Sequence, residues 1–441
     1  MSKYTQSKEA LDSHLLLWDI RPTQTSIEEK YEINVYPATT YEDTYGAPID
    51  FVIPNQPNGC LYDIELMTTW QIKKGAATLL DKDNVSIVNN FSNAIWSFVD
   101  IQVGNRVNIM QSMEQAYAYQ TFFNTVLNNG SNRTDYLNET ETFVMDTGQS
   151  KSDTECVIFF DDDAKKILNK GGEKRAKQIR LSEEITSKTK LHAPLLNHSK
   201  VLPTNMSVKV TLTRNKNNFL LLSNDEDHIV DIKKVHLICT YLRPREVVLN
   251  LLEERLKQSP ALYDIESPQI SMRTIPKDVK QYTLYDFFPS KLPKASFFAL
   301  VTASDLAGGY KRNPFTFNRM ASFQIYIDNR EFYNFPIKFV NNGDDRLDFS
   351  QAYIQLYKAL GLDRSGDCLI NGDNFKINYM IGAVLTADKS HLNHLNLQKT
   401  ADVRIELELQ NTATEPMVLV TYSLYDKLYS IDKDRQLTII E

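Results

Sequence analysis

A strand–turn–strand–helix pattern occurs twice in this sequence, about half a chain apart. The first copy covers residues 97–128 and the second covers residues 322–360. In each copy an alternating strand meets a tight turn, a short strand returns, and an amphipathic helix follows. The turn arginines, Arg106 and Arg330, are 224 positions apart (330 − 106) in a chain of 441 residues. The repeat predicts one β-rich domain built twice.

The start of each predicted helix has the same pattern. Ser112 is followed three residues later by Gln115, and Asp348 by Gln351, which is the spacing of a capping box. Each glutamine begins the tripeptide Gln-Ala-Tyr, so we expect the tripeptide at the same helical position in both copies. We interpret these residues as core packing with the tyrosine hydroxyls at its edge, not as a cofactor pocket.

Short alternating apolar and polar runs, broken by proline and glycine, recur along the chain. They begin in residues 31–74 and continue at 208–213, while residues 235–242 are apolar nearly throughout, as in a strand buried on both faces. The runs at 403–409 and 417–424 repeat these two near the chain's end. This rhythm is typical of antiparallel strands. The predicted fold is all-β with a few short helices, arranged as two tandem eight-stranded jelly rolls.

The same runs divide the chain into four parts. We expect an N-terminal arm over residues 1–30, a first jelly roll over 31–244, a connecting helix over 245–260 and a second jelly roll over 261–441. Pro244 is predicted in the first turn of the connecting helix. The apolar stripe of that helix consists of Val248, Leu251, Leu252 and Leu256.

Composition excludes some functions. The formal charge of −7 disfavours a surface whose main role is to wrap nucleic acid, so contact with DNA would need a local patch. The scattered cysteines lack CxxC spacing, which favours synthesis in a reducing intracellular site. We find no apolar run long enough for a signal peptide or a membrane span. The cysteines are Cys60, Cys156, Cys239 and Cys368.

Several short clusters contain residue types that could bind a metal ion, but each cluster has a simpler interpretation. The histidines could approach a metal, yet too few lie close in sequence, and polar loops are favoured. The aspartates lack EF-hand spacing, so solvated turns are favoured. The histidines are His192, His198, His391 and His394, and the aspartates are Asp161 to Asp163, Asp344, Asp345, Asp432 and Asp434.

A basic cluster follows the first aspartates and could touch DNA if it faced the inside of a particle. Acidic residues interrupt it and stacking aromatics are missing, so an exposed, partly helical loop is favoured. The cluster consists of Lys165, Lys166, Lys170, Lys174, Arg175, Lys177 and Arg180. We find no nucleophile elbow, phosphate-binding glycine loop or HExxH pattern, and so expect neither catalysis nor a cofactor or metal.

Several longer motifs occur in a recognisable order. They are residues 15–28, residues 46–51, the first copy of the repeat through Phe143 with residues 146–147, residues 309–317 and residues 425–435. Together they resemble the hexon-type major capsid proteins of adintoviruses and Polinton (Maverick) elements. The most specific pieces are the Pro-Thr-Gln-Thr-Ser-Ile run at 22–27 and the Asn-Pro-Phe-x-Phe run at 313–317.

The resemblance implies a double jelly-roll capsid protein that forms pseudo-hexagonal homotrimers and tiles an icosahedral shell around double-stranded DNA. It implies neighbouring capsomers, penton and minor capsid proteins as partners, weak contact with DNA, and a place in the virion after synthesis in the host cell. Our hypothesis is that residues 1–27 line the shell interior and bridge capsomers. The alternatives are a duplicated carbohydrate- or receptor-binding β-sandwich protein and a domesticated host copy that has lost shell assembly.

Overall fold

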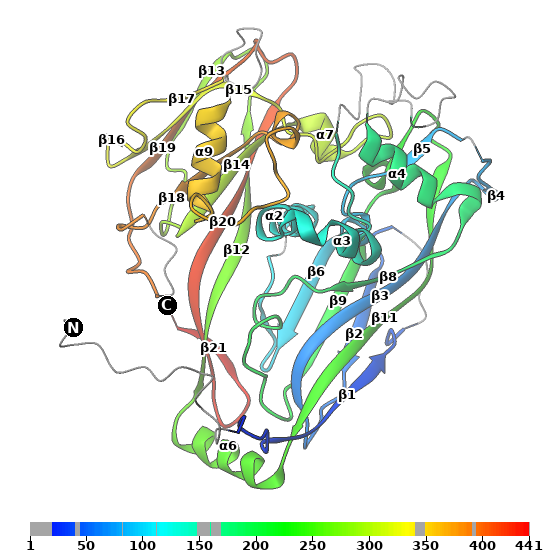
Figure 1. Cartoon of the computed structure of the whole chain (residues 1–441), viewed down its shortest axis with the longest axis vertical. Coiled ribbons are helices and arrows are strands. Elements are labelled where there is room, and N and C mark those ends of the chain that lie inside the picture. Colours follow the sequence, from blue (N-terminus) through cyan, green and yellow to red (C-terminus); the bar gives the residue numbers. More distant parts are fainter. Residues whose placement is uncertain are drawn as a thin grey trace, which may run out of the picture.

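Antiparallel sheets are the main secondary structure of the molecule and form two halves that lie side by side (Figure 1). In this computed structural model, the residues described are 20–39, 45–81, 83–111, 113–147, 159, 169–339, 349–389 and 394–440. Within them, strands β1–β11 pair with one another and strands β12–β21 pair with one another. Helix α6 (Glu246–Gln258) joins the two sets at the bottom of the view.

The first half has two larger sheets and a two-stranded one. The first has the order β1 (Ile27–Val35), β11 (His228–Pro244), β3 (Cys60–Lys74) and β4 (Ala77–Thr78), with β8 (Ile185–Lys190) also on β3. The second has the order β2 (Pro48–Ile53), β9 (Val208–Arg214), β6 (Trp96–Val103) and β7 (Val107–Asn108). The small sheet pairs β5 (Val85–Ile87) with β10 (Leu221–Ser223).

The second half repeats the two larger sheets. One has the order β12 (Ala261–Ile275), β20 (Met417–Ile431), β14 (Ala295–Thr302) and β18 (Met380–Val384), with β21 (Leu437–Ile440) also on β20. The other has the order β13 (Gln281–Leu284), β19 (Val403–Leu409), β15 (Met320–Ile327) and β16 (Arg330–Glu331), with β17 (Ile337–Lys338) also on β15.

The order of strands shows the duplication. β2-β9-β6-β7 corresponds to β13-β19-β15-β16, and the strands of the predicted repeat, β6 and β15, hold the same place in each. A register shift interrupts both ladders near their start, between Trp96 and Phe98 in β6 and between Met320 and Ser322 in β15. The expected all-β fold is confirmed, and the duplication extends to local irregularities.

Several strands of the sandwiches have one buried face, whereas β14 and β18 are buried on both faces. In β9, Val208, Val210 and Leu212 are buried while the residues between them are half-exposed, and β19 shows the same alternation. Because side chains alternate across a strand, this pattern directs one face of each sheet into the core. A single continuous cluster of buried apolar residues extends through both halves.

The helices within the described residues are short. The α-helices are α1 (Phe91–Ala94), α2 (Ala116–Asn128), α3 (Thr134–Glu141), α4 (Lys170–Gln178), α5 (Asn217–Leu220), α6, α7 (Ala303–Ala307) and α9 (Ser350–Ala359). Single 3-10 turns lie at Ser131–Arg133, Arg180–Ser182 and Asn374–Lys376. None of these helices is long and apolar enough to cross a membrane.

The predicted capping boxes are wrong at the glutamines. Gln115 precedes α2 with a left-handed φ of 64°, and its side-chain amide exchanges two hydrogen bonds with Asn215, at 3.0 and 2.7 Å. Gln351 is the second residue of α9, because the residue that precedes the helix is Phe349 and not the expected Asp348. The tertiary contact with Asn215 therefore holds Gln115 outside the helix. Ser112 and Asp348 lie outside the described residues.

The connecting segment also differs from expectation. Pro244 ends β11 rather than starting the helix, and α6 begins at Glu246 after Arg245. Leu256 is the only residue of the predicted stripe that is buried. At the other end of the first half, β1 begins at Ile27, inside the range predicted for the arm, and pairs with the last residues of β11.

Candidate functional site: the joint between the halves

Aromatic side chains connect the two halves at the centre of the molecule. Helix α2 of the first half lies between the two sets of sheets (Figure 1). Phe122 of α2 stacks on Phe315, with ring centroids 4.6 Å apart and planes 8° from parallel. Phe123 stacks in the same way on Phe317, at 5.6 Å. The Asn-Pro-Phe-x-Phe motif of the sequence therefore supplies the two phenylalanine rings with which the second half contacts α2.

Two more contacts extend the joint. Phe123 also stacks on Tyr422 of β20, with centroids 5.5 Å apart. The hydroxyl of Tyr119 donates a 2.8 Å hydrogen bond to the carbonyl oxygen of Pro314. Burial raises the pKa of Tyr119 well above its usual value, so this hydroxyl stays protonated. The hydroxyl of Tyr119 is thus buried in the joint with its hydrogen bond formed.

A buried polar network lies beside the aromatic joint. We call Asp146, Arg175, Asn169 and Asn313 the Asp146 network. Oδ1 of Asp146 accepts hydrogen bonds from Arg175 at 2.6 Å and from Asn169 at 2.9 Å, and Oδ2 accepts one from Asn313 at 3.1 Å. All four residues are buried. Because Asn313 belongs to the second half, one carboxylate ties both halves together.

The same network corrects the prediction for the basic cluster. Arg175 was expected on an exposed loop, but α4 places it in the core with no exposed surface. Its Nε also donates to the carbonyl oxygen of Ile87 at 2.9 Å. A buried guanidinium persists because carbonyl and carboxylate oxygens occupy its donors. Lys170 and Lys177 instead pair with Glu173 at the surface, and Lys165 and Lys166 lie outside the described residues.

A third set of contacts closes the lower end of the joint. Arg435, in the turn between β20 and β21, donates to the carbonyl oxygen of Thr204 at 2.9 Å and to Glu253 of α6 at 2.5 Å. Burial would raise the pKa of Glu253, but its hydrogen bonds with Arg435 and Thr204 lower it below the usual value. The first half, the connecting helix and the C-terminal hairpin are thereby joined.

The predicted histidine positions do not form one site. Nδ1 of His192 lies 2.7 Å from the Asn124 amide nitrogen, and its Nε2 lies 3.7 Å from Glu141. His198 lies near Asp264 and His394 near Asp388, whereas His391 is outside the described residues. In the described part of the chain, no three His, Cys, Asp or Glu side chains are grouped to hold a metal ion.

The aspartate clusters can be followed only near the C-terminus. Oδ1 of Asp432 accepts hydrogen bonds from the backbone N–H groups of Asp434 and Gln436, both at 2.9 Å. This carboxylate therefore stabilises its own turn, as aspartates at turns commonly do. Asp161 to Asp163, Asp344 and Asp345 lie outside the described residues.

Three of the four cysteines are buried in the fold as free thiols: Cys60, Cys239 and Cys368. Burial raises the pKa of Cys60 to about 11 and that of Cys239 to about 12, so both thiols stay protonated and unreactive near neutral pH. Cys156 lies outside the described residues. These thiols therefore act as small apolar side chains of the core.

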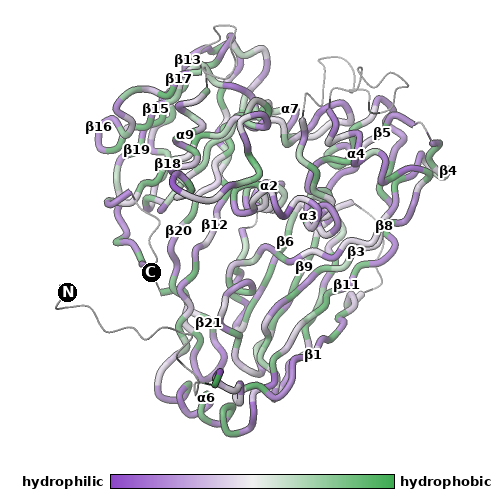
Figure 2. The backbone as a smooth tube through the Cα atoms, viewed as in Figure 1, coloured by the Kyte–Doolittle hydropathy of each residue, from purple (hydrophilic) through white to green (hydrophobic). Residues whose placement is uncertain are grey.

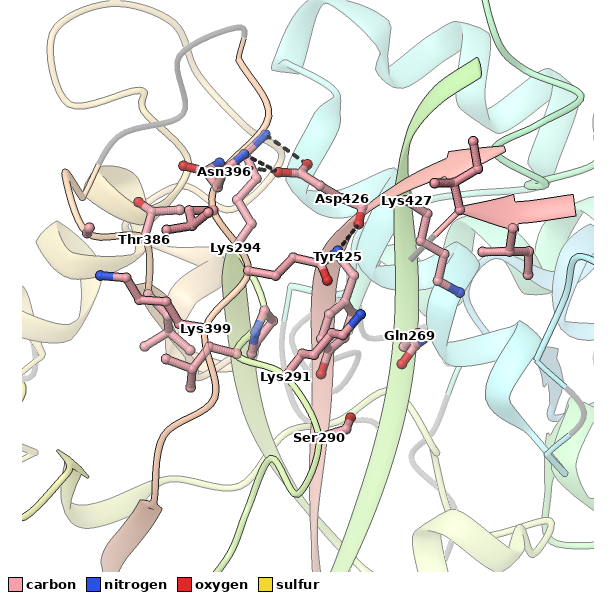
Figure 3. Close-up of a pocket in the computed structure, with 18 residues that line it drawn as sticks. Gln269, Ser290, Lys291, Lys294, Thr386, Asn396, Lys399, Tyr425, Asp426 and Lys427 are labelled. Carbon is pink, nitrogen blue, oxygen red and sulfur yellow. Dashed lines mark hydrogen bonds and ion pairs between the residues drawn. The ribbon is translucent and has the colours of Figure 1, made fainter. Parts of the chain in front are cut away.

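A pocket of about 380 Å³ on the second half was not predicted from the sequence. It lies where the edge of β20 is open, because β14 pairs with β20 only as far as Ala295 opposite Leu424, and β21 pairs with β20 only from Ile440 opposite Leu428 onward. Lys294 reaches Asp426 at 3.9 Å, and Asn396 also binds this carboxylate (Figure 3). Lys399 and Lys427 lie on opposite sides of that view. The cationic groups are therefore spread around the pocket and do not converge on one anion.

Comparisons with known proteins identify the fold. No family model and no curated protein sequence matches the chain. Among solved structures, a chain of the Sputnik virophage is similar with a TM-score of 0.58 and 9% identity, covering 98% of this chain and 93% of that one. The Faustovirus major capsid protein is similar with a TM-score of 0.58 and 8% identity, covering 94% and 92%. The mavirus major capsid protein has a TM-score of 0.54 and 13% identity, covering 100% and 97%.

These similarities extend over nearly the full length of both partners, so they include the two halves and the joint between them. At identities of 8–13% they concern the fold and not individual residues. Together with the repeated order of strands, they establish the architecture: the chain has the double jelly-roll fold of the Faustovirus and mavirus major capsid proteins.

Proposed function

We propose that this chain is a hexon-like major capsid protein, which trimerises into pseudo-hexagonal capsomers and tiles an icosahedral shell around double-stranded DNA. The observation that carries the proposal is the full-length likeness to major capsid proteins, on both sides of the joint. A likeness to one jelly roll alone would fit many binding proteins, because that fold hosts many functions.

The duplicated fold suits this role physically. If residues 31–244 and 261–441 each form one jelly roll, three copies present six similar sandwiches around a threefold axis. Such a unit fills a sixfold lattice position with only threefold symmetry. The two sandwiches must then keep a constant relative orientation, and the stacked phenylalanines and the Asp146 network provide a rigid connection for this purpose.

The motif resemblance supports a finer assignment to the capsid proteins of adintoviruses and Polinton elements. On this proposal the chain is made in the host cell and resides in the virion capsid. Its partners are two further copies in the trimer, neighbouring capsomers, and penton and other minor capsid proteins. Contact with DNA is weak or indirect, consistent with the net charge of −7.

Purified protein is expected to be a trimer. Three copies share interfaces built from long inter-strand loops, and many weak lattice contacts then add up across a shell. Light scattering coupled to size exclusion should give three times the mass of 50.7 kDa, and negative-stain electron microscopy should show hexagonal particles or shells. A stable monomer that binds glycans would instead support the carbohydrate-binding alternative, and trimers that never form shells would support a domesticated copy.

Deletion of residues 1–26 is expected to leave trimers intact but to reduce the yield and stability of shells. We propose that in the shell the arm lines the interior and bridges capsomers, so its removal weakens contacts between capsomers. Within its own copy the deletion removes the hydrogen bond from the Arg245 N–H to the Ser26 carbonyl oxygen, which lies outside the sheets. The deletion stops before Ile27 because β1 begins there. Electron microscopy of particles after a salt titration measures the effect, and shells of normal stability would exclude this role for the arm.

A further inference from the structure

Helix α6 presents an apolar face to solvent. Val247, Leu251 and Leu252 are 72%, 60% and 49% exposed, respectively. Residues 247 and 251 are four apart and therefore lie on the same side of the helix, with Leu252 beside them. Figure 2 shows hydrophobic as well as hydrophilic residues along this helix at the bottom of the molecule. We call these three side chains the α6 patch.

The opposite side of α6 is already occupied. Glu253 binds Arg435 and Thr204, and Leu256 is buried against the core. Leu251 comes two residues before Glu253, which places it about 200° around the helix axis, away from these contacts. Leu252 comes four residues before Leu256 and therefore lies at the edge between the anchored side and the exposed side. The helix is thus anchored by one side, while the α6 patch has no described residue covering it. Clustered exposed apolar side chains of this kind mark interaction sites.

We propose that in the free protein, before shells form, the α6 patch is the docking site for the leucine-rich segment of the N-terminal arm, residues 11–18, of the same copy. The place where the arm enters the fold supports this occupant. The backbone N–H of Arg245, the residue before α6, donates a 3.0 Å hydrogen bond to the carbonyl oxygen of Ser26. The chain therefore enters β1 directly beside the start of α6.

The length of the arm also fits. Residues 19–26 can span at most about 26 Å when extended. Helix α6 has 13 residues and is therefore about 20 Å long. The leucine-rich segment can thus reach any part of the α6 patch without leaving its own copy.

The sequence of the segment has the chemistry that the patch requires. Leu11, Leu15 and Trp18 recur at intervals of four and three residues, the spacing of one face of a helix. An amphipathic helix packed on an exposed apolar face is a common recognition mode, with anchors at this spacing. Docking would bury the α6 patch together with the arm's leucines, and the hydrophobic effect would stabilise the pair.

The charges on α6 argue against a lipid surface as the occupant. Helices that lie on anionic membranes are rich in lysine and arginine on the polar face. Here three basic residues are balanced by three acidic ones, so no net attraction to anionic lipid results. The basic residues are Arg245, Arg255 and Lys257, and the acidic ones are Glu246, Glu253 and Glu254.

Tryptophan fluorescence of the free protein tests the proposal, independently of whether shells form. The chain has three tryptophans, and Trp70 and Trp96 are fully buried. The difference between the emission spectra of the wild type and the Trp18→Phe variant therefore gives the emission of Trp18 alone. If the arm docks, Trp18 should emit at short wavelength and resist quenching by iodide. In the double variant Leu251→Asp/Leu252→Asp the emission should shift to that of water-exposed tryptophan, with several-fold stronger quenching.

Leu397→Asp is the matched control, because Leu397 is 85% exposed and lies in the second half; it should leave Trp18 unchanged. Hydrogen exchange gives a second readout: removing residues 1–19 should speed exchange in α6 and not in α2. A water-exposed Trp18 in the wild type, or no response to the α6 substitutions, would overturn the proposal.

Co-expression distinguishes the arm's own copy from a neighbour. One variant carries Trp18→Phe with an intact α6, and the other keeps Trp18 but carries the two α6 substitutions. Docking within one copy predicts that Trp18 stays exposed in mixed oligomers. A protected Trp18 there would show that the arm docks on a second copy, and would overturn docking within one copy.

Discussion

Asp146→Ala is expected to lower the free energy of unfolding by about 3–5 kcal/mol, because the substitution leaves the guanidinium of Arg175 buried without its counter-charge. Arg175 has no exposed surface, so water cannot replace the lost carboxylate. Asn169 and Asn313 also lose the oxygen that accepts their hydrogen bonds. Denaturant unfolding followed by circular dichroism measures the change.

Glu173→Gln is the control for this experiment. Glu173 is also paired, with Lys170 and Lys177, but at the surface of α4, where an ion pair contributes about 0–1 kcal/mol. The double variant Asp146→Ala/Arg175→Ala should lose less stability than the sum of the two single variants, since the two side chains interact directly. Equal effects of Asp146→Ala and Glu173→Gln would show that the Asp146 network contributes little.

Phe315→Ala is expected to lower the free energy of unfolding by a similar amount, about 3–5 kcal/mol, through the cavity left beside α2. Phe315 stacks on Phe122 and also contacts the rings of Tyr119 and Phe219, all three in the first half. Its loss should therefore weaken the connection between the halves more than either half itself. Scanning calorimetry should show one unfolding transition in the wild type and two in the variant.

Phe335→Ala removes the same side chain from a surface position, since Phe335 is 75% exposed. This control should change the free energy of unfolding by less than about 0.5 kcal/mol and keep a single transition. If Phe315→Ala unfolds in one transition at nearly the wild-type temperature, then the aromatic joint does not couple the two halves.

Local patterns in the sequence were sufficient to predict the structure where a single strand or a single repeat determines it. The alternation at Val208, Val210 and Leu212 predicted a strand with one buried face, and that face packs into the core. The repeat around Arg106 and Arg330 predicted the duplication, and the order of the sheets confirms it. These features depend on neighbours within about ten residues, so the sequence carries them directly.

Patterns failed where the partner of a residue is distant in sequence. Arg175 lies among lysines and was predicted to be exposed to solvent. It is buried, because its counter-charge Asp146 comes from a separate segment of the chain. Gln115 was read as part of a capping box, but Asn215, 100 positions away, binds its side chain. The α6 stripe has helical periodicity, yet the periodicity alone did not indicate that Leu251 and Leu252 face solvent while Leu256 is buried.

The sequence by itself determined that two like β-rich units follow one another, because hydrophobic alternation and turn residues act over short distances. Only the tertiary structure decided how the units join. The Asn-Pro-Phe-x-Phe motif was visible in the sequence as a distinctive run, but its role follows from its contacts with Phe122 of α2, 193 positions away (315 − 122), and with Asp146, 167 positions away. Such contacts depend on which surfaces meet after folding, and burial there determines whether an aromatic or a charged residue stabilises the core or remains in water.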